Sequence, residues 1–229
     1  TGEGIAILEN PANTFTGGVT ISMGSVLIDG ISYGGVAGYL GAATADPANL
    51  VFDGGTLSFT PSGPAQAQST DRGFTINAGK TATIAVTNNA SLTISGNVPA
   101  TTGALTKTGN GTLALSGNLA FTGEATVSAG RLNIDGTLGP GATPGDSLSV
   151  AAGSTLGGSG TIHRDVYVSG THSPGSSPGL QTIDGAVIYN PGATVVWELA
   201  ASTTAGRGTN YDGIDGNGHV ANFLGSTTL

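Results

Sequence analysis

Two stretches of the chain decide the fold: residues 15–30 read FTGGVTISMGSVLIDG, and residues 121–136 read FTGEATVSAGRLNIDG. They align without gaps at a spacing of 106 residues, and nine of the sixteen positions are identical. Internal repetition of this kind is typical of solenoids, in which each repeat buries its apolar side chains against its neighbours. The repetition favours a stacked architecture over a sandwich of two antiparallel sheets.

A shorter phrase recurs inside and outside these stretches: an apolar residue, two spacers and a glycine. Copies begin at Ile21, Phe52, Ile76, Val127, Val150 and Tyr189. In a variant that begins at Val86, Asn89 takes the place of the glycine. Glycine and asparagine both tolerate positive φ, so the phrase predicts a strand, a tight turn and another strand.

The composition agrees with a narrow, stacked interior. Of the 229 residues 41 are glycine, only 5% are aromatic and only 9% are charged. No stretch of twelve or more residues carries a capped apolar stripe with helical spacing. The phrase steps of 24 and 23 residues, from Phe52 to Ile76 and from Val127 to Val150, set the coil length. We predict an all-β parallel β-helix of roughly eight coils over residues 1–200, with an irregular closing segment over residues 201–229.

Charge and composition exclude several classes of protein. The net charge of −8 argues against a nucleic-acid partner, because such binding depends on neutralising phosphates. No run of about 18 apolar residues is present, so this segment is not expected to insert into a membrane. Without cysteine there are no disulfides and no thiolate chemistry. The first residues lack the pattern of a signal peptide, and we interpret the chain as a mature or excised segment of a longer protein.

One continuous region resembles a known repeat family. Residues 105–118 read LTKTGNGTLALSGN, followed by FTG at 121–123 and VSAGRL at 127–132. This order resembles the autotransporter-associated β-strand repeat of bacterial passenger regions, and residues 4–30 match its second half. Residues 156–162, 173–179 and 195–199 resemble the stretches that often follow in such regions. The resemblance implies an extracellular, right-handed parallel β-helix at the bacterial cell surface, from which adhesive or enzymatic loops project.

We predict from this that the chain is a non-catalytic structural or adhesin-like passenger segment. Its expected partners are glycans or proteins on host or neighbouring cells, or further copies of itself. A carbohydrate-active β-helix enzyme, either a polysaccharide lyase or a hydrolase, is one alternative. Such an enzyme would bring at least three carboxylate or basic side chains together in a groove. A self-associating fibre or matrix protein that stacks end to end is the other alternative.

Two insertions break the coil spacing and are the best candidates for recognition. They lie at residues 30–49, which contain Tyr33 and Tyr39, and at residues 60–73. Loops that leave one side of a solenoid often form its binding surface, and exposed tyrosines suit contacts with carbohydrate or protein. We therefore predict Tyr33 and Tyr39 as binding residues, and we expect Trp197 to seal the last coil.

One loop near the end of the chain has the composition of a weak calcium site. Asp212, Asp215 and Asn217 lie in the glycine-rich stretch of residues 210–218, and oxygen ligands of this kind suit calcium. A structural turn is the alternative interpretation, and no other cofactor is expected.

No catalytic residue is predicted. His163 and His172 lack metal-ligand spacing and are expected to lie in surface loops. An aspartate before a glycine is first of all a turn former. This interpretation applies to Asp29, Asp53, Asp135 and Asp184.

Overall fold

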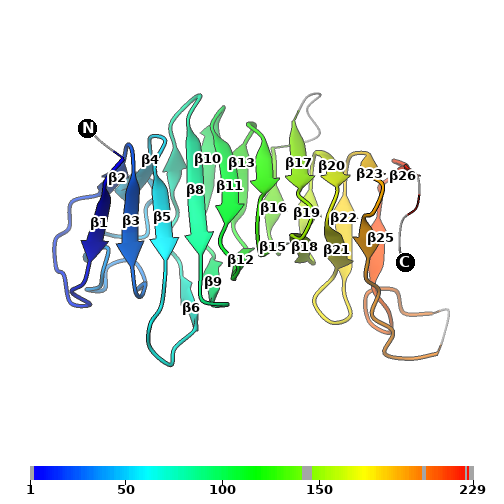
Figure 1. Ribbon diagram of the computed structural model, residues 1–229, viewed down its shortest axis with the longest axis horizontal. Coiled ribbons are helices and arrows are strands. Elements are labelled where there is room, and N and C mark those ends of the chain that lie inside the picture. The colour runs from blue at the N-terminus through cyan, green and yellow to red at the C-terminus, as the bar shows by residue number, and fades with distance from the viewer. Residues whose placement is uncertain (1–2, 141–145, 203–204, 225, 227–229) are drawn as a thin grey trace.

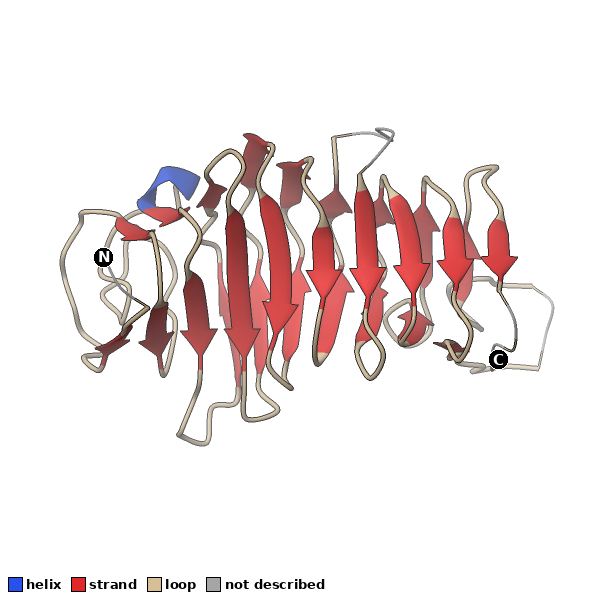
Figure 2. Ribbon diagram, turned by 45° about the horizontal axis from the view of Figure 1, so that its top comes forward, coloured by secondary structure: helices blue, strands red, loops and turns tan. Residues whose placement is uncertain are grey.

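The computed structural model describes residues 3–140, 146–202, 205–224 and 226 and shows a parallel β-solenoid (Figures 1 and 2). All pairings between its named strands are parallel. In the part of the chain that the structure describes, the single helical element is the 3₁₀ turn η1 (Pro47–Asn49). The prediction of an all-β solenoid of about eight turns is confirmed.

The strands form three faces. Face A is one sheet of ten strands: β1 (Ile5–Leu8), β3 (Ser25–Ile28), β5 (Thr56–Phe59), β8 (Thr81–Val86), β11 (Ala104–Thr108), β14 (Ala125–Val127), β17 (Ser147–Val150), β20 (Asp165–Val168), β23 (Val187–Tyr189) and β26 (Ala221–Phe223). At a strand spacing of about 4.8 Å, ten strands extend over roughly 43 Å.

Face B contains two sheets. The first is β2 (Val19–Ile21), β4 (Leu50–Phe52) and β7 (Thr75–Ile76). The second is β10 (Val98–Thr101), β13 (Asn118–Phe121), β16 (Thr137–Leu138), β19 (Thr161–Ile162), β22 (Leu180–Ile183) and β25 (Gly213–Asp215). The sheets meet where β7 contacts β10, and the Phe74 amide donates to the Asn97 carbonyl at 3.2 Å.

Face C is a sheet of seven strands: β6 (Ala67–Thr70), β9 (Ser91–Ile94), β12 (Thr112–Leu115), β15 (Arg131–Ile134), β18 (Thr155–Gly158), β21 (Thr171–Pro174) and β24 (Thr194–Val195). A complete coil visits face A, then C, then B, as β11, β12 and β13 do before β14 begins the next coil. The chain therefore turns at three corners, A to C, C to B and B to A.

Identical side chains stack in the interior. On face C the register aligns Leu92 with Leu113, Leu113 with Leu132 and Leu132 with Leu156, and all four are buried. Each coil thus covers the inward side chains of the coil below it. Complete burial of one such leucine stabilises the fold by about 2 kcal/mol relative to exposure.

The recurring phrase makes tight turns, as predicted, but at two different corners. The copies that begin at Ile21, Phe52 and Ile76 connect face B to face A, whereas all later copies, including the asparagine variant, connect face A to face C. Positive φ occurs at the glycine of most copies and at Asn88 and Asn89 of the variant. The two stretches of the long repeat therefore build different corners of the solenoid.

Lys107 explains part of the repeat signature. Its side chain is buried, and its ammonium donates to the carbonyls of Thr108, Gly109 and Ala129 at 2.7, 2.9 and 3.1 Å. Burial lowers the pKa of Lys107 to about 8. The lysine of the LTKTGNGTL phrase thus ties together the carbonyls of two successive A-to-C corners.

The winding continues into the segment predicted to be irregular. Within residues 201–229, β25 pairs with β22 and β26 pairs with β23, both in parallel. Ile214 packs against the core, and the ring of Phe223 stacks on Tyr189 with centroids 4.8 Å apart. These apolar contacts extend the solenoid beyond residue 200, because a further coil can bury them against the preceding one.

Candidate functional site

Three long connections leave face A in the first third of the chain. Residues 9–18 follow β1, residues 29–49 follow β3, and residues 60–66 follow β5. The connection from β5 to β6 projects well beyond the ends of the strands (Figure 1). Strand β6 lies within the predicted second insertion, so this insertion returns to the ladder of face C. We call residues 30–49 and 60–73 the joined insertions, because they contact each other directly.

Hydrogen bonds connect the two insertions at several points. The Ile31 amide donates to the side-chain oxygen of Gln68 at 2.8 Å, and the Gly34 amide donates to Asp71 at 2.7 Å. The Thr70 hydroxyl donates to the carbonyl of Ser32 at 2.9 Å. The second insertion therefore fixes the backbone of the first.

Arg72 lies at the centre of this contact and is only 4% exposed. Its guanidinium donates to the carbonyls of Gly41, Ser32 and Ala43 at 2.8, 3.0 and 3.0 Å. Burial lowers the pKa of Arg72, while the charge of Asp71 opposes the shift. One buried cation thus binds backbone oxygens along most of the first insertion, in a stretch without regular structure. Two of these oxygens also accept from other donors, Ser32 from the Thr70 hydroxyl and Ala43 from the Gly35 amide.

A groove lies beside the joined insertions and consists of two adjoining compartments of about 250 and 260 Å³. Both compartments are lined by Asp29 and Tyr39. We call the two together the insertion groove. Its other lining residues are Pro11, Gly30, Ile31, Ser32, Pro61, Gly63, Pro64, Ala65 and Gln68 in one compartment, and Ile7, Leu8, Glu9, Leu27, Thr60 and Ser62 in the other.

The two predicted tyrosines lie in one loop but in different surroundings. Tyr39 lines the insertion groove, and a Cβ atom at Gly30 would lie only 2.8 Å from its ring, so a side chain at residue 30 would displace the ring. Tyr33 is 51% exposed, and its hydroxyl contacts the Ser69 hydroxyl at 2.8 Å, away from the groove lining. A binding role for either residue stays a prediction.

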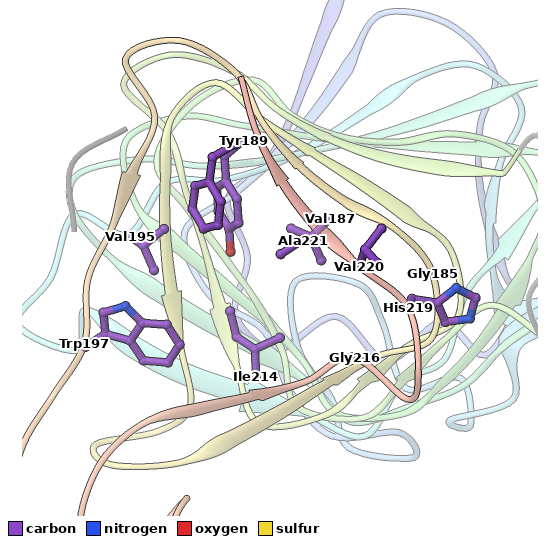
Figure 3. A pocket seen from close by; sticks show the side chains of 11 residues that line it. Gly185, Val187, Tyr189, Val195, Trp197, Ile214, Gly216, His219, Val220 and Ala221 are labelled. Atoms are coloured by element: carbon purple, nitrogen blue, oxygen red, sulfur yellow. The ribbon is translucent and has the colours of Figure 1, made fainter. Parts of the chain in front are cut away.

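A second hollow occupies the interior of the last coil (Figure 3). This terminal pocket has a volume of about 250 Å³, and Tyr189, Val195 and Ile214 line it from faces A, C and B. Trp197 also lines the pocket and remains 46% exposed. Trp197 therefore narrows the end of the solenoid but does not seal it as expected.

The prediction of a surface position for His172 is wrong, because the side chain is completely buried next to the terminal pocket. On face C the register places His172 beside Leu156, so the histidine continues the leucine stack. Gln181 donates its amide to the Gly157 carbonyl and accepts from His172 Nε2 at 2.7 Å, while His172 Nδ1 accepts from the Tyr189 hydroxyl at 2.8 Å. Burial lowers the pKa of His172 to about 4, so the imidazole is neutral.

His163 and His219 flank the carboxylate of Asp184 at 3.1 and 3.3 Å. The hydrogen bond from His163, followed by the one from Asn217, holds the pKa of Asp184 below its usual value. This cluster connects the turn after β22 to the loop of the last coil. In the described residues no group of three His, Cys, Asp or Glu side chains is arranged to hold a metal ion.

The residues of the predicted calcium loop have separate partners. Asp212 is buried and accepts from the amides of Gly179 and Glu198 at 2.9 and 2.7 Å. Asp215 lies 3.3 Å from Arg207, and Asn217 donates to Asp184 at 3.0 Å. Calcium binding here stays a prediction.

Sequence reasoning missed the buried cations Arg72 and Arg164. Arg164 donates to the carbonyls of Phe121 and Gly123 at 2.8 and 2.9 Å, and its guanidinium carbon lies 4.9 Å from the centre of the Phe121 ring. Burial lowers its pKa to about 10. No local pattern marks these positions, because the carbonyls that receive the cations lie about 30 to 40 residues away in the sequence.

Three parallel faces, tight glycine corners and a buried lysine define the chain as a parallel β-solenoid. A model of the passenger-associated-transport-repeat matches residues 1–28 and 105–134. The predicted resemblance is thereby confirmed, in the same two regions.

The chain is similar to one curated relative, the adhesin BmaC autotransporter of Brucella suis biovar 1 (strain 1330), with 34% identity over 94% of the chain. The chain spans about 6% of the length of that relative. No solved structure matches the chain. The repeat and the autotransporter similarity place the chain outside the cell, at the bacterial surface. Within the described residues no helix is both long and apolar enough to span a bilayer.

Proposed function

We propose that this segment is a non-catalytic, adhesin-like part of a passenger region, in which the solenoid is a rigid spacer and the joined insertions contact the partner. The observation that carries the proposal is the set of hydrogen bonds from buried Arg72 to the carbonyls of Ser32, Gly41 and Ala43. A long surface loop held in one conformation loses little conformational entropy on binding. The similarity to an autotransporter named as an adhesin supports the same role.

The roles of the aspartates support the absence of catalysis in this proposal. Asp29 accepts from the amide and the hydroxyl of Ser62, and Asp53 accepts from Asn77 at 2.9 Å. Asp135 accepts from the Ser159 amide at 3.2 Å. Each carboxylate holds a turn on a neighbouring coil. A polysaccharide lyase or hydrolase would need such groups converged on one substrate.

Cell binding by the purified segment tests this proposal. We expect the segment to bind to host or neighbouring cells, and the variant Arg72→Met to bind at least about tenfold more weakly because the joined insertions lose their conformation. The matched control is Tyr167→Ala, which removes an exposed tyrosine of face A outside the insertions. Equal binding by all three proteins would overturn the assignment of the insertions. Depolymerisation of a polysaccharide by the segment would overturn the non-catalytic role.

Self-association is a second candidate function, favoured by the two ends of face A. Ile5 and Ile7 of β1 are 67% and 56% exposed, and Phe223 of β26 is 50% exposed. Among the described residues both strands are outermost in their sheet, and an edge strand can pair with a strand of another copy or of an adjoining part of a longer chain. Light scattering tests this candidate. A molecular mass that rises with concentration would support it, and a constant monomer mass would contradict it.

A further inference from the structure

We propose that the insertion groove binds an uncharged saccharide, with the ring of Tyr39 as its stacking surface. This inference rests on the proposed function and names the ligand class of the joined insertions. It distinguishes the two tyrosines of the first insertion, because Tyr39 lines the groove whereas Tyr33 does not.

The shape of the groove suits a small, compact ligand. Two compartments of about 250 and 260 Å³ adjoin at Asp29 and Tyr39, and sites for small ligands are concave hollows of this order. A protein partner would instead need about 800 Å² of matching surface on each side. Two adjoining hollows with a shared aromatic wall are consistent with consecutive rings of an oligosaccharide.

The lining offers both kinds of contact that a sugar ring makes. The ring of Tyr39, with the prolines Pro61 and Pro64, provides apolar surface for the C–H faces of a pyranose. Asp29 provides hydrogen-bond acceptors for hydroxyls. Its carboxylate binds the amide and the hydroxyl of Ser62, yet an ionised carboxylate has about four acceptor positions.

Charge selects among saccharides. The charged side chains among the described residues that line the groove are Asp29 and Glu9, both acidic. The nearest insertion cation, Arg72, is buried, and its guanidinium points to backbone carbonyls. A sialylated or sulfated glycan would place its negative charges next to these carboxylates without a compensating cation. The groove should therefore discriminate against anionic glycans.

The groove is also organised in advance. Gln68 accepts from the Ile31 amide and donates to the Ala65 carbonyl at 2.8 and 3.2 Å, so it fixes the walls of one compartment. Gly30 leaves room for the Tyr39 ring beside the backbone, because an added Cβ atom would lie 2.8 Å from it. A site whose walls are already fixed loses less free energy to ordering on binding.

The test measures binding of the intact segment to a panel of neutral oligosaccharides and to sialylated and sulfated ones. We expect binding to neutral members only, a loss of about tenfold in affinity in Tyr39→Ala, and a change below about twofold in the matched control Tyr33→Ala. Tyr39→Phe retains the ring and should bind within about threefold of the parent protein, which covers the case that Tyr39→Ala does not fold.

Other outcomes separate this inference from the proposed function. A preference for anionic glycans, or an equal loss in Tyr33→Ala, would overturn the saccharide assignment. Binding of the segment to a cell-surface protein but to no member of the panel would overturn it as well, and would leave the adhesin-like role intact. Absence of binding both to the panel and to cells would overturn the inference and the proposed function together.

Discussion

The first third of the chain and the later coils use the corner between faces A and C differently. From β8 onward this corner is closed by tight turns, several of them copies of the glycine phrase. After β1, β3 and β5 the same corner is replaced by long connections, and the phrase appears at the B-to-A corner instead. The joined insertions and their groove lie where the tight turn is missing.

The difference shows how a regular solenoid acquires a specific surface. A four-residue turn specifies a local change of direction, and it works equally well at either corner. Removal of the turn from one corner in successive coils places several loops side by side, where they can contact one another. The terminal pocket has a different origin, because it is the unfilled interior of the last coil and its lining is mainly apolar. A hollow in a solenoid is therefore not by itself evidence of a ligand site.

The largest expected effect is the loss of ordered structure in the first third of the chain. Arg72→Met removes the charged donor of the buried Gly41 carbonyl and one of the donors to the Ser32 and Ala43 carbonyls, and we expect a loss of about 4 kcal/mol in the unfolding free energy of this region. Limited proteolysis should then cleave within residues 30–46 while the later coils stay intact. The control Arg207→Ala removes a half-exposed ion pair with Asp215 and should cost below about 1 kcal/mol. Unchanged protease resistance in Arg72→Met would contradict the central role of this residue.

Two glycines at the A-to-C corner of the later coils give a matched comparison. Gly130 and Gly153 both have positive φ, 68° and 80°, but only at Gly130 would a Cβ atom collide, at 2.4 Å from the carbonyl oxygens of Gly109 and Gly111. Gly153→Ala should cost about 1 kcal/mol from backbone strain alone. Gly130→Ala should cost about 3 kcal/mol because neighbouring coils must separate. Equal costs in chemical denaturation would show that coil spacing adjusts freely at this corner.

Acid should weaken the coils next to the terminal pocket. The folded pKa of His172 is about 4 and its unfolded pKa is about 6.5, so protons bind preferentially to the unfolded chain as the pH falls. The stability that neutral, buried His172 provides is fully present above the unfolded pKa of about 6.5 and decreases as the pH falls toward the folded pKa. About 2 kcal/mol of unfolding free energy should be lost between pH 8 and pH 5. Chemical denaturation at both pH values measures the loss. His172→Gln should show a correspondingly smaller change, and an identical pH dependence in both proteins would contradict the assignment.

The smallest effect concerns calcium. Binding at Asp215 and Asn217 should raise the unfolding free energy by about 1.4 kcal/mol at a calcium concentration ten times the Kd. Thermal melting with and without 10 mM calcium, about ten times the upper Kd of about 1 mM for weak extracellular sites, measures this rise. Asp215→Asn should abolish it. A melting temperature that calcium does not change would assign this loop to a structural turn.

Much of the architecture could be predicted from the residues alone. The glycine phrase marks its turns correctly. Asn89, which takes the place of the glycine in one copy, has the positive φ expected at that position. The insertions at residues 30–49 and 60–73 were predicted because they interrupt the coil length. The burial of His172 could not be predicted, since a histidine in a polar-looking stretch gives no sign that it will lie under a leucine stack. Its partners Gln181 and Tyr189 lie 9 and 17 residues away.

The sequence by itself determined that the chain winds, where it turns and which small apolar residues point inward. These features depend on preferences that act within a few residues, such as positive φ at glycine and alternation along a strand. Only the tertiary structure decided which corner each turn occupies, which carbonyls receive Arg72 and Lys107, and how Tyr39 comes to line a groove. These features depend on the accumulated length of every preceding coil, because an added loop shifts which distant segments lie next to each other.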